Sequence, residues 1–349
     1  MKKRFTAMIL CMIMIAMMLP VTVFAAGGDK SIMLGASNIS SYDSTNGYDY
    51  IYYGTWGNDP IKWRVLDNQT NTGTTGLFLL TDTLLGSGSN GDLNLSNTSP
   101  NGNSWQSSNE QAWCRDFAGI EGNGVTDAFS INELAAVQGT TKSDRGFTCN
   151  MNAFASSDNI LNGDKVFFLS AEEANNADYG FTDNGARVAN YGVGAGKWWL
   201  RSRPYFKDSI ASGVNDSGSV GTVQIDDTLA ARPAFNLNLN SVLFTSAADN
   251  SGQNATLAAP ADYSGNEWKV TLKDANSFAE GASVNKATVA PGETLQVTHK
   301  ALSGFTDAGY TNVTAAISDG DGKLLYYGSV GSEPDATSSD VTIPAELAE

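Results

Sequence analysis

Two short segments constrain the fold of this chain more than any other part of its sequence. Lys197–Ser202 reads KWWLRS, and Ala231–Leu237, which follows a long polar stretch, reads ARPAFNL. Both are rich in aromatic and aliphatic residues that favour β-strands, and each carries an arginine beside bulky apolar groups. We therefore expect two strands of one core, joined by a long loop that includes Tyr205–Gly221.

The region before these segments has the pattern of an antiparallel meander. Apolar runs at Tyr50–Tyr53, Ile61–Leu66 and Leu77–Leu80 are separated by turn-forming residues. In the second run apolar and charged residues alternate, with Trp63 on the apolar face. This alternation is typical of a half-buried strand.

Three positions carry the capping box, a signature of a helix start. In this motif a Ser side chain and a Glu or Gln three residues later each accept a hydrogen bond from the other's backbone. The pairs are Ser108 with Gln111, Ser130 with Glu133, and Ser170 with Glu173. Short helices set between strands predict an α+β domain.

Two loops are the candidate ligand-binding regions. The Gly86–Ser107 segment is rich in Gly, Ser and Asn, so we expect a surface loop there, as at Tyr205–Gly221. Such loops either hold a ligand or merely connect strands. If they bind, the expected contact residues are Trp105, Tyr205, Phe206, Asn215 and Asp216.

The N-terminus has the pattern of a secretory signal peptide. Three basic residues, Lys2–Arg4, precede an apolar run, Phe5–Leu19, and the small residue Ala25 stands at the expected cleavage point. Pro20 breaks the run short of the ~20 apolar residues that a membrane span needs. We therefore expect residues 1–25 to be removed and the mature protein to be secreted or at the cell surface, without membrane insertion.

The charge of the chain argues against one class of partner. Loss of the three basic residues changes the formal net charge from −16 to −19. Nucleic acid and anionic lipid surfaces would therefore be repelled. The acidic residues either keep a secreted protein soluble or bind calcium, but the sequence contains no EF-hand loop. No metal site and no cofactor are predicted.

Two cysteines, Cys114 and Cys149, remain after cleavage, in a compartment that would be oxidising. They either form one disulfide or stay as separate buried thiols, since free cysteine packs as a small hydrophobic residue. Neither is expected to be catalytic.

Composition also suggests domain boundaries. Six of the seven tryptophans lie between Trp56 and Trp199, whereas the segment that follows residue 246 is rich in Ala, Ser, Gly and Asn. The expected divisions are a signal peptide (1–25), an N-terminal lead (26–47), a large domain (48–246), a polar connecting segment with a strand near 267–273 (247–285), and a small domain (286–349).

The small domain is expected to be an immunoglobulin-like β-sandwich. Its strands are predicted at Thr294–Thr298, Val313–Ser318 and Lys323–Tyr327, with Asp319–Gly322 as a hairpin turn. Few residues follow the last strand, Val341–Ile343. Either the domain is small with an open edge, or the chain stops before the domain is complete.

The order of the strand-like segments resembles a known family. The segments are Tyr52–Gly54, Ile61–Leu66, Val166–Ser170, Trp198–Ser202 and Ala231–Phe235. Together they look like a domain of unknown function that is widespread in secreted proteins of Gram-positive bacteria. That domain is in turn similar to the C-type-lectin fold, as in formylglycine-generating enzymes and the variable proteins of diversity-generating retroelements.

The resemblance implies roles for the tryptophans and arginines. It implies that Trp198 and Leu200 lie in the core, with Trp199 and Arg201 on the opposite face of the strand. Arg201 and Arg232 would hold loops through hydrogen bonds to carbonyl or carboxylate oxygens. The core markers are Trp63, Trp198, Trp199, Arg201 and Arg232.

Catalysis is not predicted. The only histidine, His299, lies outside the large domain. The sequence contains neither the calcium motifs of sugar-binding C-type lectins nor the late thiol pair of formylglycine-generating enzymes. Adjacent acids at Glu172–Glu173 and Asp226–Asp227 leave a glycan-acting enzyme as an alternative.

The sequence therefore favours an α+β fold, with a C-type-lectin-like large domain followed by a small all-β immunoglobulin-like domain. The expected function is that of a secreted or cell-surface, non-catalytic binding protein for an extracellular carbohydrate (glycan) or protein. The alternatives are an extracellular glycan-acting enzyme and a structural component of a surface assembly.

Overall fold

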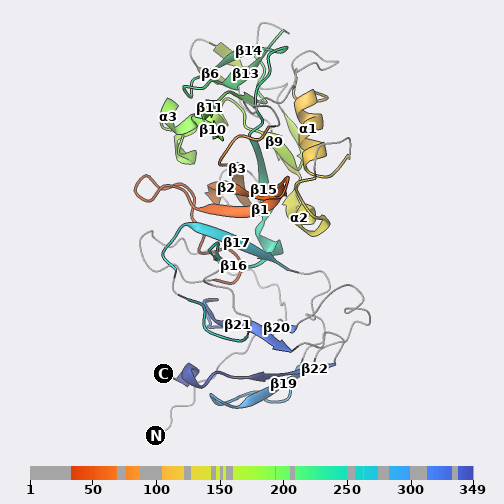
Figure 1. Cartoon of the computed structure of the whole chain (residues 1–349), viewed down its shortest axis with the longest axis vertical. Helices are drawn as coiled ribbons and strands as arrows, with labels where there is room; N and C mark the ends of the chain where they lie inside the picture. Colours follow the sequence, from red (N-terminus) through yellow and green to blue (C-terminus); the bar gives the residue numbers. More distant parts are fainter. Residues whose placement is uncertain are drawn as a thin grey trace. The chain divides into compact units, whose positions relative to one another are not determined.

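The chain divides into two compact units, each built mainly from strands (Figure 1). The larger unit consists of Ile39–Ser241 with Asn266–Trp268, and the second of the described residues in segments 1–38, 242–265 and 269–349. The structure, a computed structural model, describes residues 33–68, 76–86, 104–121, 127–142, 147–149, 152–154, 160–192, 194–204, 209–249, 256–261, 263–273, 283–298, 313–331 and 337–348.

The central sheet of the larger unit confirms the predicted meander. β1 (Tyr50–Trp56), β2 (Asp59–Asn68) and β3 (Gly76–Thr81) pair antiparallel in chain order. The sheet also contains β17 (Glu267–Leu272, of which the first two residues belong to this unit) next to β1, β15 (Pro233–Asn238) next to β3, and β4 (Val137–Gln138) and β9 (Val166–Phe168) next to β15.

One face of this sheet carries an aromatic core. The Trp63 ring of β2 meets the Phe235 ring of β15 edge to face, with centroids 4.6 Å apart, and Tyr53 of β1 lies 5.6 Å from the same ring. Two helices, α1 (Asn109–Phe117) and α2 (Ile131–Ala136), lie beside the sheet in Figure 1. Aromatic side chains each bury about 150–250 Å², so this cluster dominates the stability of the unit.

The two signature segments lie in different sheets. Trp198–Leu200 forms β12, which pairs with β13 (Ile210–Val214), and β13 pairs with β14 (Val220–Gln224). The second segment enters β15 of the central sheet. They meet at Ala230, whose backbone N–H donates to Lys197 O (2.9 Å) and whose carbonyl accepts from Trp199 N (3.2 Å).

The long loop expected at Tyr205–Gly221 is corrected by the structure, because much of it forms the β13–β14 hairpin. The composition of β13, Ile-Ala-Ser-Gly-Val, resembles a loop, yet all five residues are buried. Small residues are required there, since a Cβ at Gly213 would lie 2.9 Å from Val223. Close packing, and not exposure, therefore explains the small side chains.

The capping boxes predict where helices begin, and two of the three starts are confirmed. α1 follows Ser108, whose Oγ accepts from Gln111 N at 3.0 Å, and α2 follows Ser130 with both bonds of the box. The third box forms between Ser170 and Glu173 but leads only to a 3₁₀ turn, η1 (Glu173–Asn175). The Asn176 side chain accepts from Asp178 N and ends that turn.

The predicted α+β, C-type-lectin-like fold class is wrong, because the protein is mostly β and has several separate sheets. Among the described residues there are three α-helices, of nine, six and four residues, the last being α3 (Asn184–Arg187). A capping box specifies the start of a helix and not its length. Helices this short add no separate layer to the fold.

Several small elements complete the larger unit. They are β5 (Thr140–Lys142) with β8 (Leu161–Asp164), β6 (Phe147–Cys149) with β7 (Asn152–Phe154), β10 (Ala189–Tyr191) with β11 (Gly194–Gly196), and the 3₁₀ turns η2 (Ala177–Tyr179) and η3 (Leu239–Ser241).

The second unit contains strands and one 3₁₀ turn among its described residues. The strands predicted at Thr294–Thr298 (β19) and Val313–Ser318 (β20) are confirmed. The others are β16 (Val242–Ala247), β18 (Ser283–Val284), β21 (Leu324–Gly331) and β22 (Ser338–Thr342), and the turn is η4 (Ala345–Ala348). β18, β19 and β22 form one sheet, β20 and β21 another, and Leu295, Ile317 and Val341 share a core.

The described residues include no helix with the length and hydrophobicity that a bilayer crossing requires. The predicted signal peptide, residues 1–25, lies outside them.

Candidate ligand-binding face

Three tyrosines form a row on the larger unit. Tyr48 precedes β1, and Tyr50 and Tyr52 lie within it at alternate positions, so their side chains share one face of the sheet. Ile51 and Tyr53 point to the opposite, core-facing side and are buried. The three row tyrosines are only partly buried, which leaves part of each ring accessible.

Two cations of β2 lie over this row. The strand register places Arg64 opposite Tyr50 and Lys62 opposite Tyr52. Lys62 Nζ lies 4.1 Å from the Tyr50 ring centroid, and Arg64 Cζ lies 4.8 Å from that of Tyr48. Each cation thus contacts a diagonal neighbour at cation–π distance, which fixes the tilt of both rings.

Each cation is also paired with a carboxylate. Lys62 Nζ lies 2.6 Å from Glu267 Oε1 of β17, and Arg64 Nη2 lies 2.5 Å from Asp82 Oδ1, just after β3. The Tyr52 hydroxyl donates to the second Glu267 oxygen at 2.8 Å. The face therefore carries two positive and two negative side chains in closed pairs.

The pKa shifts of these groups favour a charged Lys62–Glu267 pair and neutral tyrosine hydroxyls. Burial opposes the charged form of Lys62, but the bond to Glu267 outweighs it and raises the lysine pKa. The bond from Lys62 in turn lowers the pKa of Glu267. Burial raises the pKa of Tyr48, Tyr50 and Tyr52, so their hydroxyls stay protonated well above neutral pH.

The start of the row is held by the turn after η2. The Tyr48 hydroxyl donates to Tyr179 O at 2.8 Å, and the ring of Tyr42 lies 4.8 Å from that of Tyr48. Gly180, at φ +81°, leaves room for both rings, since a Cβ there would lie 2.1 Å from the Tyr48 hydroxyl oxygen. We call the set the tyrosine face: Tyr42, Tyr48, Tyr50, Tyr52, Lys62, Arg64, Asp82 and Glu267.

A buried arginine lies beside this face, on the same side of the sheet as Arg64 and Asp82. Arg232 is fully buried with its guanidinium 4.8 Å from the Trp198 ring centroid. Its Nε donates to Thr81 O (3.1 Å) and its Nη1 to Arg187 O (3.3 Å). Burial, together with nearby Arg64, lowers its pKa. These contacts make Arg232 a support that ties the start of β15 to the end of β3 beside the face.

The second signature arginine belongs to a buried ion network. Arg201 Nη1 donates to Glu173 Oε2 at 2.5 Å and to Phe168 O at 2.8 Å, and Lys142 Nζ donates to Glu173 Oε1 at 2.5 Å. Burial alone would raise the pKa of Glu173, but the two cations outweigh it and hold it at about 2. This acid is therefore a structural link that stays charged at neutral pH.

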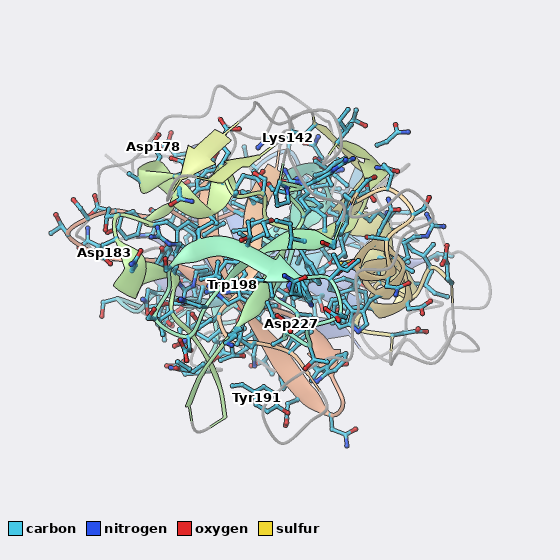
Figure 2. All side chains as sticks on the ribbon, turned by 90° about the horizontal axis from the view of Figure 1, so that it is seen from above. Lys142, Asp178, Asp183, Tyr191, Trp198 and Asp227 are labelled. Carbon is cyan, nitrogen blue, oxygen red and sulfur yellow. The ribbon has the colours of Figure 1, made fainter. Side chains whose placement is uncertain are left out.

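The five core markers are all buried, so none of them presents a ligand surface. Their exposed fractions are at most 2%: Trp63, Trp198, Trp199, Arg201 and Arg232. Trp199 and Arg201 are as buried as Trp198 and Leu200, because β12 is covered on both faces. In Figure 2 Trp198 lies toward the middle of the view, whereas Asp178 and Asp183 lie toward its rim.

The structure does not bring the predicted ligand residues together at one surface. Trp105 is 2% exposed, with its ring 5.9 Å from that of Phe168, which corrects its expected place on a surface loop. Asn215 and Asp216 are exposed in the β13–β14 turn, where Asn215 Oδ1 already accepts three hydrogen bonds from Ser217 and Ser219. Tyr205 and Phe206 lie outside the described residues.

Helix α1 buries two titratable groups. Cys114 is a free, fully buried thiol whose pKa is raised by burial, and the side chain of Cys149 lies outside the described residues. Glu110, one turn earlier, is 2% exposed, and Ser108 and the backbone at the start of the helix favour its charged form only weakly. Burial raises its pKa to about 8.

The acids considered for catalysis lie in different surroundings. Glu173 is held in its ion network, whereas Asp226 and Asp227 are exposed in a turn. His299 lies outside the described residues. Within the described ranges, no group of three or more His, Cys, Asp or Glu side chains is arranged to hold a metal ion.

The tyrosine face has a sequence signal of its own. Tyrosine recurs at every second position from Tyr48 to Tyr52, and cations recur at the same spacing at Lys62 and Arg64. On paired strands, a spacing of two places such residues on one face. The amino-acid sequence alone therefore indicates the rings and cations of the face, whereas Asp82 and Glu267 come from distant positions.

The fold and this face define a mostly β protein with a partly exposed aromatic and charged sheet surface. Comparison with known families matches residues 75–239 to a domain of unknown function, DUF6273. Comparison with curated proteins and with solved structures finds no significant match. The matched range includes Asp82 and Arg232, whereas β1 and β2 precede it.

Proposed function

We propose that this chain is a non-catalytic binding protein that holds a carbohydrate on the tyrosine face. It acts outside the cell or at the cell surface, in the manner of secreted proteins of Gram-positive bacteria, as its N-terminal sequence and strand order suggest. The observation that carries the proposal is the row of partly buried tyrosines interleaved with ion-paired polar side chains.

The chemistry of this surface suits a sugar. The C–H face of a pyranose ring packs on an aromatic ring, and sugar hydroxyls both donate to carboxylates and accept from ammonium and guanidinium groups. Tyr50 and Tyr52 supply partly exposed rings, and Glu267 and Asp82 supply acceptors within the same surface. Tyrosine hydroxyls that stay neutral add further donors and acceptors.

The test is retention of the purified protein on a glycan array and on insoluble polysaccharides, with Tyr50→Ala/Tyr52→Ala as the variant. Loss of two stacking rings at about 0.5–1.5 kcal/mol each predicts roughly 5- to 150-fold weaker binding. Tyr191→Ala is the matched control, since Tyr191 is also partly buried but lies on β10, with its hydroxyl donating to Gly86 O.

Each outcome decides the proposal. The proposal is supported if glycan retention falls in Tyr50→Ala/Tyr52→Ala and persists in Tyr191→Ala. Circular dichroism must show that both variants are folded. Absence of glycan retention, or retention equal in all three proteins, would refute the assignment. Release of soluble sugars that stops on Glu172→Gln or Asp227→Asn would replace it with the enzyme alternative.

A further inference from the structure

We infer that the ligand of the tyrosine face is an uncharged polysaccharide chain in extended form, lying along β1. This inference rests on the proposed function and adds the class of carbohydrate. It follows from the charge balance of the face and from the direction of the tyrosine row.

The charge balance comes from closed pairs. Lys62 is held by Glu267 at 2.6 Å and Arg64 by Asp82 at 2.5 Å, so an anionic sugar must either displace a carboxylate from its cation or lie beside that carboxylate. Breaking such a pair leaves its partner uncompensated, which opposes the binding of a uronate or a phosphate.

The surroundings disfavour a polyanion further. The chain has a formal net charge of −16, and acidic surfaces repel anionic polymers over about a Debye length, ~10 Å at 0.1 M salt. The acids of the face are themselves engaged by cations, so they offer no free carboxylate to a cationic sugar. A neutral hydroxyl can instead use the remaining N–H groups and carboxylate lone pairs without breaking either ion pair.

The direction of the row gives the shape of the ligand. From Tyr48 to Tyr52 the strand rises by about 13 Å, at ~3.3 Å per residue, which is longer than one sugar ring. The Tyr42 ring, with its centroid 4.8 Å from that of Tyr48, adds a further ring to the row. Several consecutive sugar units in an extended chain are therefore in contact at once.

The experiment is calorimetric titration with neutral linear oligosaccharides, from disaccharide to hexasaccharide, at about 0.05 M and about 0.5 M NaCl. Polygalacturonate and chitosan oligomers are the charged probes. We expect affinity for a neutral series to rise at least tenfold (~1.4 kcal/mol) with length and to change less than about twofold with salt. Binding confined to a charged probe, and weakened by salt, would overturn the inference.

A matched pair of variants tests the charge argument. Glu267→Gln keeps an acceptor for Lys62 and Tyr52 but leaves the face with one excess positive charge, so salt-sensitive polygalacturonate binding should appear. Glu121→Gln makes the same charge change in the pair with Arg115, away from the face, and should not. Polygalacturonate binding that appears equally in both variants, or in neither, would overturn the inference that charge balance excludes anionic sugars.

Failure of the inference and failure of the proposed function are distinguishable. Binding of only charged glycans that is lost in Tyr50→Ala/Tyr52→Ala would refute the uncharged class and leave the proposed function standing. Neutral binding with no dependence on length would refute the extended chain alone. Absence of binding to every glycan would refute both.

Discussion

Glu110 should make the stability of the larger unit fall as pH rises from 5 to 8. Its carboxyl is buried in α1, and its pKa rises from 4.5 to about 8 because burial outweighs hydrogen bonding from Ser108 and the backbone. Above pH 4.5 the unfolded chain loses this proton while the folded chain keeps it. The free energy of unfolding therefore decreases until the pH passes about 8.

The size of the effect follows from the shift. A displacement from 4.5 to about 8 corresponds to roughly 5 kcal/mol in total, of which about 3–4 kcal/mol falls between pH 5 and pH 8. Glu110→Gln stays neutral at every pH and so removes this dependence. The variant should match the native protein near pH 5 and exceed it by about 3 kcal/mol at pH 8.

The assay is urea unfolding followed by tryptophan fluorescence at pH 5, 6, 7 and 8. All seven tryptophans lie in the larger unit, so the signal reports that unit alone. The only histidine is His299, which leaves few other groups titrating in this range. Glu121→Gln removes the same charge at an exposed position, and its free energy of unfolding should fall with pH as steeply as that of the native protein. If the free energy of unfolding fell equally with pH in the native protein and in Glu110→Gln, the role assigned to Glu110 would be refuted.

Two further changes test the supports of the site. Glu173, with its pKa lowered to about 2, contributes stability that is complete above pH 4.5 and is lost as pH falls toward 2. Glu173→Gln should therefore cost about 3 kcal/mol at pH 7 and progressively less toward pH 3 in urea unfolding, and a constant deficit would contradict this. Gly180→Ala combines φ +81° with contact on Tyr48, and should lower stability by about 1–3 kcal/mol in thermal unfolding. Gly192→Ala, at φ +55° with open space around it, measures the cost of the backbone conformation alone. An equal loss of stability in both variants would show that contact with Tyr48 contributes nothing at Gly180.

The strands are more predictable than their arrangement. The alternation around Trp63 and the turn residues between the runs predict β1 to β3 correctly, because pleating and turn chemistry are local. The pairing of β15 with β3 joins residues about 150 positions apart, as in the bond from Arg232 to Thr81 O. Nothing local encodes such a partner, so the sheets to which β12 and β15 belong could not be predicted.

The candidate site is harder to predict than the strands that carry it. Gly- and Ser-rich composition predicts exposed loops, but at β13 it reflects tight packing around Gly213, and Trp105 at the end of another such segment is buried. Tyrosine favours strands, so the residues from Tyr48 to Tyr52 indicate a strand more directly than a binding surface. Their alternation identifies one face of a sheet, but only the structure shows Glu267 and Asp82 completing it.

The tyrosine face and its support are separable, and this bears on specificity. Arg232 lies beside the face and bonds to the carbonyl oxygens of Thr81 and Arg187 and packs on the Trp198 ring, none of which is a side chain of the face. A substitution at Tyr50 or Tyr52 therefore changes the surface without removing these supporting bonds. The residues matched to the domain of unknown function, 75–239, include the support, whereas β1 and β2 supply the rings and cations from outside that range. Under the proposed function, ligand choice would therefore depend on β1 and β2, which lie outside the matched range.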